Sequence, residues 1–212
     1  MADTVDMKKT ETTSKAVSRR KFIQGVIAGG AGVSSATYLF RASSLASAAG
    51  AGERLITLNV NGQQRRVDVM KQETLAMTLR YKLGLTGTKI GCDRAECGAC
   101  TVLIDDVPRY SCSTLTHTVR NAKVVTVEGL QAADGKLHPV QQGILDEQGF
   151  QCAFCMSGFI MATVGYLQTN PNPTRAELAH GISGNLCRCQ DYDKILTAMM
   201  RGAEIAREGN HA

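Results

Sequence analysis

The stretch GCDRAECGACTV, residues 91–102, decides the fold because it places three cysteines on one short loop. A fourth cysteine follows after eleven residues, so the spacing is C-x4-C-x2-C and then one more thiol. The four are Cys92, Cys97, Cys100 and Cys112. Thiols on so tight a loop converge only where the backbone turns sharply, and Gly91 and Gly98 beside them permit such a turn. The spacing is typical of a plant-type [2Fe–2S] site.

A second set of four cysteines lies in the C-terminal half, spaced as C-x2-C and then C-x-C. These are Cys152, Cys155, Cys187 and Cys189. The first pair stands at the start of one helical pattern and the second pair just before another. Two helix starts that face each other would offer four thiolates and two positive dipole ends to an anionic cluster. Each cysteine set therefore predicts one [2Fe–2S] cluster.

Two other uses of the eight cysteines are open. Four cysteines per site also describe structural zinc, although a C-x-C pair is uncommon there. An even number of cysteines suits disulfides, especially in an exported protein. A disulfide within C-x-C is strained, however, and three cysteines of the first set are crowded on one loop. Iron–sulfur clusters are therefore the favoured interpretation, with zinc and disulfides as alternatives.

Around the first set, residues 53–130 read as a small α+β domain. Asn61-Gly62 is a two-residue hairpin signal between two stretches that alternate apolar and polar residues. The expected elements are strands at 55–60 and 67–70, a helix at 74–83, a strand at 101–104, a turn at 105–108 and a strand at 123–127.

Residues 136–208, after a turn-rich linker at 131–135, read as an all-α domain. Helices are expected at 138–148, 157–169, 174–180 and 191–208. Thr174 and Glu177 form a capping box at the start of the third helix. The pattern predicts a four-helix bundle that carries the second cysteine set.

Residues 1–48 read as an export signal. Arg19-Arg20 precedes an apolar run at 26–40 that is rich in small residues, and Ala46-Ser47-Ala48 is an A-x-A cleavage site. The paired arginines resemble the twin-arginine motif, which predicts cleavage after Ala48 and export of the folded, cofactor-loaded protein to the periplasm. An uncleaved membrane anchor is the alternative.

The formal net charge of +5 comes almost wholly from this segment. Residues 1–48 hold 7 of the 24 Lys+Arg and 3 of the 19 Asp+Glu, which leaves 17 and 16 on the other 164 residues, a net +1. The body has no basic surplus with which to neutralise phosphates, so nucleic acid is excluded as a partner. No membrane contact is expected after signal cleavage.

Three motifs taken together resemble a known family: residues 91–102, QCAFCMSGFIM at 151–161 and GNLCRC at 184–189. They are similar to the iron–sulfur part of the xanthine oxidase family of molybdenum hydroxylases. The resemblance is closer still to the separate small subunits of bacterial members, such as periplasmic aldehyde oxidoreductases and isoquinoline 1-oxidoreductase, and covers residues 54–208. It implies a β-grasp domain of the plant-type ferredoxin kind followed by a four-helix domain, with one [2Fe–2S] cluster in each.

The resemblance also implies roles for individual residues. The first cysteine set would hold the outer cluster, and the second set would hold the cluster nearer molybdenum. Gln151 and Cys189 would lie against the pterin of molybdopterin, either plain or as its cytosine dinucleotide. Most of that pterin pocket would belong to a large partner subunit.

The sequence departs from the family motif near the second set. Ala153 replaces glycine, Met156-Ser157 replaces Thr-Pro, and Gln190-Asp191 replaces Thr-Gly. No cysteine is lost through these changes. Ser157 is still expected to cap the helix that follows it.

The chain has no evident acid–base or nucleophile constellation, so its predicted role is electron transfer rather than catalysis. It would relay electrons from a molybdopterin centre, through the second-set cluster and then the first-set cluster, to an external acceptor. That acceptor would be a flavin subunit, a c-type cytochrome or a quinone. The substrate, an aldehyde or an N-heterocycle, would be hydroxylated on the large subunit.

Two other functions remain as alternatives: a freestanding periplasmic ferredoxin-like carrier, and a zinc-stabilised interaction module. Arg188, which lies between two of the predicted ligands, would either stabilise the charge of the cluster or form a surface ion pair.

Overall fold

The computed structural model describes residues 18–29 and 54–210. The chain divides into two units, Met1–Ala51 and Gly52–Ala212, and both cysteine sets belong to the second unit. In the first unit, residues 19–29 form a helix, while the predicted cleavage site at Ala48 lies outside the described residues. Among the residues that the structure describes, no helix combines the length and apolar character needed to cross a bilayer.

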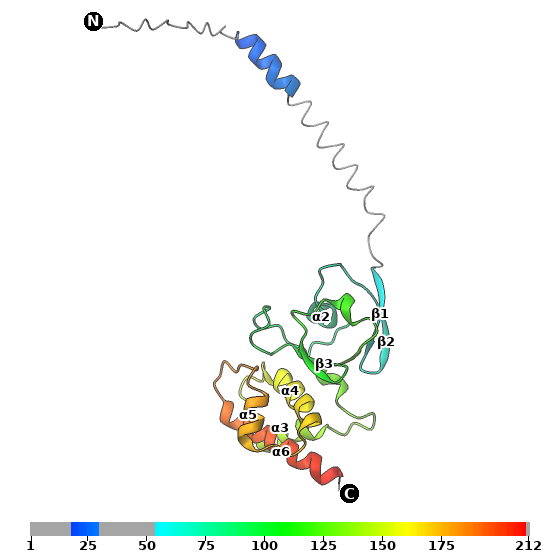
Figure 1. Cartoon of the computed structure of the whole chain (residues 1–212), viewed down its shortest axis with the longest axis vertical. Helices are drawn as coiled ribbons and strands as arrows, with labels where there is room; N and C mark the ends of the chain where they lie inside the picture. The colour runs from blue at the N-terminus through cyan, green and yellow to red at the C-terminus, as the bar shows by residue number, and fades with distance from the viewer. Residues whose placement is uncertain (1–17, 30–53, 211–212) are drawn as a thin grey trace, which may run out of the picture. The chain divides into compact units, whose positions relative to one another are not determined.

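The first half of the second unit is a five-stranded mixed sheet (Figure 1). Its strands are β1 (Leu55–Val60), β2 (Gln63–Asp68), β3 (Thr101–Ile104), β4 (Val107–Tyr110) and β5 (Lys123–Val125). The strand order is β2-β1-β5-β3-β4, with β1 and β5 parallel and every other pair antiparallel. The predicted hairpin at Asn61-Gly62 is confirmed, because both residues have positive φ, 53° and 75°, as a two-residue turn requires.

The turn predicted at 105–108 is shorter in the structure. Asp105 and Asp106 alone make the turn, with φ of 49° and 66°, and Val107 and Pro108 already pair with β3. Proline argued against a strand at this position because it cannot donate to a ladder. It is tolerated here because β4 is an edge strand of the sheet.

The helix predicted at 74–83 is present, but it changes from α-helical to π-helical geometry along its length. It begins as α2 (Leu75–Met77) and continues as a π-helical segment, η2 (Thr78–Lys82). Leu75 and Leu79 are fully buried and pack with the sheet residue Leu58 in one apolar core. The spacing of the apolar residues correctly predicted which face of the helix is buried. It did not predict the wider π-helical turn.

A buried carboxylate, Glu73, ties this helix to the loop after Cys112. Its side chain accepts hydrogen bonds from Thr78 Oγ1 at 2.7 Å and from Lys82 Nζ at 2.5 Å. Its backbone carbonyl accepts from the N–H and Oγ1 of Thr116 at 3.0 and 3.1 Å. Burial alone would raise the pKa of Glu73, but these side-chain hydrogen bonds and the N–H of Met70 outweigh it, and the pKa lies below the usual 4.5.

We expect Glu73→Gln to lower the free energy of unfolding by about 1–3 kcal/mol at neutral pH, because it leaves Lys82 without its buried partner. The lowered pKa means that the folded state favours the ionised form. The contribution is therefore fully present above pH 4.5 and is lost as the pH falls through the folded pKa. Denaturant unfolding of both proteins across this pH range measures the difference.

Asp68→Asn is the matched control, because Asp68 pairs with Arg54 at 2.8 Å on the surface, with both side chains more than half exposed. Such a pair contributes at most about 1 kcal/mol. Equal losses in the two variants, or a Glu73→Gln loss that persists at low pH, would contradict the assignment.

The second half of the unit consists of the four predicted helices. They are α3 (Pro139–Glu147), α4 (Met156–Thr169), α5 (Arg175–Gly181) and α6 (Tyr192–Asn210). The capping box of Thr174 and Glu177 is present at the start of α5, as predicted. The α+β fold, with a ferredoxin-like domain followed by a helical domain, is confirmed.

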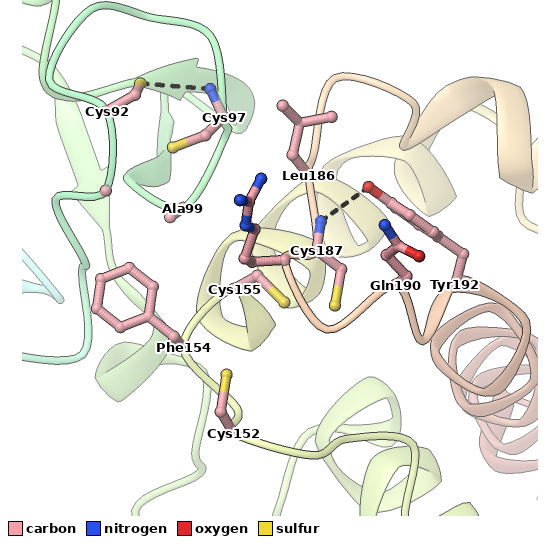
Figure 2. A pocket seen from close by; sticks show the side chains of 12 residues that line it. Cys92, Cys97, Ala99, Cys152, Phe154, Cys155, Leu186, Cys187, Gln190 and Tyr192 are labelled. Carbon is pink, nitrogen blue, oxygen red and sulfur yellow. Dashed lines mark hydrogen bonds between the residues drawn. The ribbon is translucent and has the colours of Figure 1, made fainter.

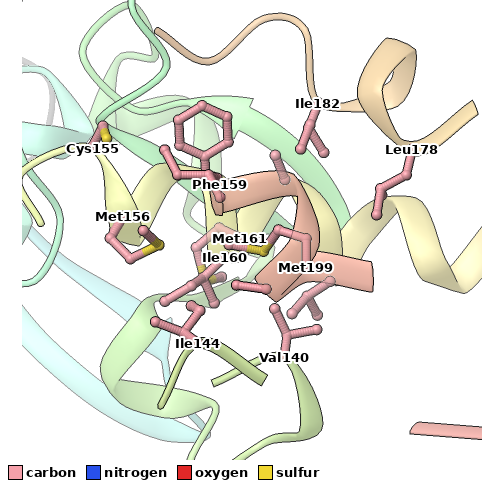
Figure 3. Packing of buried hydrophobic residues seen from close by; sticks show 14 of the residues in the cluster. Val140, Ile144, Cys155, Met156, Phe159, Ile160, Met161, Leu178, Ile182 and Met199 are labelled. Carbon is pink, nitrogen blue, oxygen red and sulfur yellow. The ribbon is translucent and has the colours of Figure 1, made fainter. Parts of the chain in front are cut away.

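Helix α4 lies at the centre of this helical domain. Residues 156–165 are buried in succession, and Phe159, Met161 and Met199 pack in one core between α4 and α6 (Figure 3). The other face of α4 packs on the sheet: a Cβ built on Gly165 would lie 3.1 Å from the side chain of Leu103 in β3. Since α4 contacts both halves, its N-terminal end brings the second cysteine set close to the first.

Candidate functional site

The first cysteine set forms two pairs. Sγ of Cys92 accepts the N–H of Glu96 and of Cys97, each at 3.4 Å, which holds Cys92 beside Cys97. Cys100 precedes β3 and Cys112 follows β4, so the pairing of these two strands brings the two thiols together. The loop 92–97 and the end of one hairpin thus offer four sulfur atoms, two from each side.

The two pairs differ in environment. Burial tends to raise the pKa of Cys92, but N–H hydrogen bonds outweigh it and lower the pKa to about 7. Burial, together with the neighbouring thiol of Cys112, raises the pKa of Cys100 to about 12. The buried thiol of Cys100 therefore favours the protonated form in the absence of a bound metal, whereas the thiol of Cys92 ionises more readily.

The two glycines predicted to shape this loop do so. Gly98 has φ of +70°, and a Cβ there would lie 2.5 Å from Nδ2 of Asn185 and 2.7 Å from the carbonyl of Gly184. A Cβ on Gly91 would lie 3.1 Å from Sγ of Cys97. The loop thus has the close backbone approach that a cluster-binding loop requires.

The second set lies at the starts of α4 and α6, as predicted. Cys155 is the N-cap residue of α4, and Cys187 and Cys189 lie just before α6. Sγ of Cys189 lies 3.4 Å from Sγ of Cys152. Burial, together with the adjacent thiol of Cys187, raises the pKa of Cys155 to about 12. This set therefore also forms two pairs, 152/189 and 155/187.

Two residues near the second set, Ala153 and Ser157, stand where the sequence departs from the family motif. The structure shows what each one does, and the capping role predicted for Ser157 is wrong. Ala153, which replaces a glycine, keeps a left-handed φ of 58°. Ser157 does not cap α4, because the helix already begins at Met156. Its Oγ instead donates to the carbonyl of Ala99, at 3.4 Å, in the first cysteine loop.

Paired thiols are the arrangement that a two-iron cluster needs, since each iron takes two protein ligands. All eight cysteines have free thiols. Within the described ranges, no three or more His, Cys, Asp or Glu side chains surround a point that could hold one metal ion. The donor chemistry, the pairing and the glycine-lined loop all fit two [2Fe–2S] clusters.

A cavity of about 870 Å³ separates the two sets. Figure 2 shows Cys92 and Cys97 on one side of it and Cys155 and Cys187 on the other. The N–H of Leu186 donates to the carbonyl of Cys97 at 2.9 Å, which links the two ligand loops directly.

Sequence reasoning missed three residues that hold the two loops together. Nδ2 of Asn185 donates to the carbonyl of Gly98 at 3.0 Å, and the hydroxyl of Tyr110 donates to the carbonyl of Gly184 at 2.9 Å. Gly158 lets α4 approach the same Gly98 carbonyl, because a Cβ there would overlap it. Asn185 lies inside the GNLCRC motif and Gly158 inside the QCAFCMSGFIM motif, and these motifs were the available signals.

Gln151 and Cys189, predicted to contact a pterin, line one small cavity with the other three cysteines of the second set and with Asp191. Gln151 is exposed and Cys189 is partly so. The structure therefore brings the two residues to the same place at the molecular surface, and the pterin contact itself stays a prediction.

This arrangement defines a protein with two iron–sulfur domains, and comparison with known families agrees. Residues 58–124 match the 2Fe-2S iron-sulfur cluster binding domain, and residues 126–200 match the [2Fe-2S] binding domain. Each matched region contains one complete cysteine set.

Comparison with individual proteins shows in which kinds of oxidoreductase similar chains occur. The chain is 43% identical over 145 residues to the nicotine 6-hydroxylase small subunit of Paenarthrobacter nicotinovorans, covering 68% of this chain and 87% of that protein. It is 39% identical over 159 residues to the aldehyde oxidoreductase iron-sulfur-binding subunit of Escherichia coli (strain K12), covering 68% and 69%. A chain in the crystal structure of quinoline 2-oxidoreductase from Pseudomonas putida 86 matches with a TM-score of 0.69 and 40% identity, covering 74% and 99%.

The chain belongs to the xanthine oxidase family of molybdenum hydroxylases, as an iron–sulfur subunit of an oxidoreductase.

Proposed function

We propose that this chain relays electrons between a molybdopterin centre in a large partner subunit and an external acceptor. When bound, two [2Fe–2S] clusters supply two one-electron carriers, one in each domain. The observation that carries the proposal is the 2.9 Å hydrogen bond from the N–H of Leu186 to the carbonyl of Cys97. This hydrogen bond joins Cys97, a predicted ligand of the first set, to Leu186, which directly precedes Cys187, a predicted ligand of the second set.

The protein's own residues hold the two ligand loops at a fixed separation. Asn185, Ser157 and Tyr110 each join one loop to the other domain by a hydrogen bond. Gly98 and Gly158 allow the backbones to touch. A fixed separation suits electron transfer because the gap between carriers does not change during turnover.

The exposed side of the second set supports the approach of a partner at this centre. Cys152, Gln151 and Phe154 are exposed beside the second set, so a partner could approach it closely. By resemblance, Gln151 and Cys189 would contact the pterin in the partner. The electrons would then leave through the first set to a flavin subunit, a c-type cytochrome or a quinone, and the substrate would be an aldehyde or an N-heterocycle.

Export by the twin-arginine route to the periplasm is part of the proposal. Its support is the sequence of residues 1–48, of which residues 19–29, including Arg20, form an exposed helix. N-terminal sequencing of the exported protein should begin at Ala49; a protein that retains Met1 would contradict cleavage.

The test is metal and sulfide analysis of the full chain, with low-temperature EPR after reduction by dithionite. We expect about four iron atoms per chain and two S = 1/2 signals. Zinc in place of iron, or a single signal, would refute the relay. Size-exclusion chromatography separates the relay from a freestanding carrier, since only the relay requires a stable complex with a large molybdenum-containing subunit.

A further inference from the structure

One carboxylate beside the second cysteine set has no part in the function proposed above. Oδ2 of Asp191 is enclosed by protein and has no hydrogen-bond partner among the described residues. The side chain lines the same small cavity as Cys152, Cys155, Cys187 and Cys189. An unpaired carboxylate oxygen in such a place is costly, and the family motif more usually has glycine at this position.

Asp191 lies at the start of a long helix. Asp191 directly precedes α6, a helix of nineteen residues, and its backbone carbonyl accepts the N–H of Ile195 at 3.0 Å. The free N–H groups and the positive dipole end at the start of a helix stabilise an anion. The carboxylate of Asp191 is therefore placed beside the four thiols, at the start of this helix.

A positive charge lies on the other side of the same thiols. Arg188 lines the large cavity between the two sets, together with Cys92 and Cys97 of the first set. Cys152, Cys155 and Cys187 border both cavities, so they lie between the carboxylate and the guanidinium. Arg188 is exposed, and no hydrogen bond or ion pair within the described ranges engages its side chain.

We propose that Asp191 favours electron flow from the second centre to the first. The inference rests on the proposed relay. An electron held at the second set is repelled by Asp191, which lowers the midpoint of this centre relative to that of the first. In the step favoured by this charge, the second centre loses one electron and the first centre gains it. Arg188, of opposite charge, acts on the second centre in the opposite sense.

The experiment is an anaerobic potentiometric titration of the full chain with both clusters, followed by EPR. The second centre is the one whose signal disappears in Cys187→Ala. Asp191→Asn removes the charge and keeps the shape, and it should raise the midpoint of the second centre. We expect about a tenfold change in the reduced-to-oxidised ratio, which is ~59 mV for a one-electron couple. The first centre should move much less.

Asp193→Asn is the matched control. Asp193 lies two residues further on in α6, but its side chain is 94% exposed and pairs with Arg175 at 2.7 Å. It should leave both midpoints unchanged. Asp191→Gly, with the family's more usual residue, should repeat the shift of Asp191→Asn, and Arg188→Gln should move the second midpoint the opposite way.

An unchanged or lowered midpoint in both Asp191 variants would overturn the inference, as would an equal shift in Asp193→Asn. Iron analysis keeps this outcome distinct from failure of the relay itself. A wild-type chain that binds fewer than two clusters would refute the relay and the inference together, whereas two clusters with an unmoved midpoint would refute the inference alone.

Discussion

Cys187→Ala is expected to cost the chain about half of its iron and one of its two EPR signals. Cys187 is buried and pairs with Cys155 at the start of α4. A [2Fe–2S] cluster needs four ligands, so the loss of one buried thiolate should empty the second site. Iron analysis and EPR of the reduced variant measure the effect, from about four to about two iron atoms.

Cys100→Ala is the reciprocal control, because Cys100 is the matching buried ligand of the first set. It should remove the other signal and leave the one that Cys187→Ala loses. Loss of both signals in either variant would mean that the two sites do not fill independently. Full iron in both variants would refute the ligand assignment.

Gly158→Ala is expected to destabilise the chain by about 3 kcal/mol and to weaken the contact between the two ligand loops. The added Cβ would overlap the carbonyl oxygen of Gly98 and lie 2.8 Å from Nδ2 of Asn185. Backbone cannot give way as a flexible side chain can, so α4 must move away from the first loop. Thermal unfolding measures the stability loss, and the rate of electron transfer between the centres should fall with it.

Gly209→Ala controls for the substitution itself. Gly209 also lies in a helix, α6, but a Cβ there meets nothing within 4 Å. Alanine favours a helix over glycine, so this variant should be neutral or slightly more stable. A Gly158→Ala protein that is as stable as Gly209→Ala would show that the two halves do not pack as closely as described.

Local signals in the sequence predicted most of the fold. The hairpin at Asn61-Gly62, the four helices and the cysteine spacings all depend on residues that are close in the chain, and all are found in the structure. The strand β4 was missed because Pro108 disfavours a strand, and its edge position could not be known in advance. The π-helical turn at Thr78 was missed because it keeps the same buried face as an α-helix.

The contacts between the two cysteine sets could not be predicted from sequence patterns. Asn185 donates a hydrogen bond to the carbonyl of Gly98, which lies 87 residues earlier in the chain. The identity of neither residue predicts such a distant partner. The cysteines could be assigned to two sets from spacing alone. How the sets face each other depends on α4 packing against the sheet, which is a tertiary property.

The two sites differ in the sequence separation of the ligands that each one brings together. Three ligands of the first set lie within nine consecutive residues, 92–100, whereas the second set joins residues 152–155 to residues 187–189 and encloses α4 and α5. A cluster in the second site therefore acts as a covalent cross-link that closes a long loop and restricts the unfolded chain, with a larger entropic effect than a link within a short loop. Loss of that cluster should thus loosen the helical half as a whole, while the first site assembles on one loop and the hairpin that follows it.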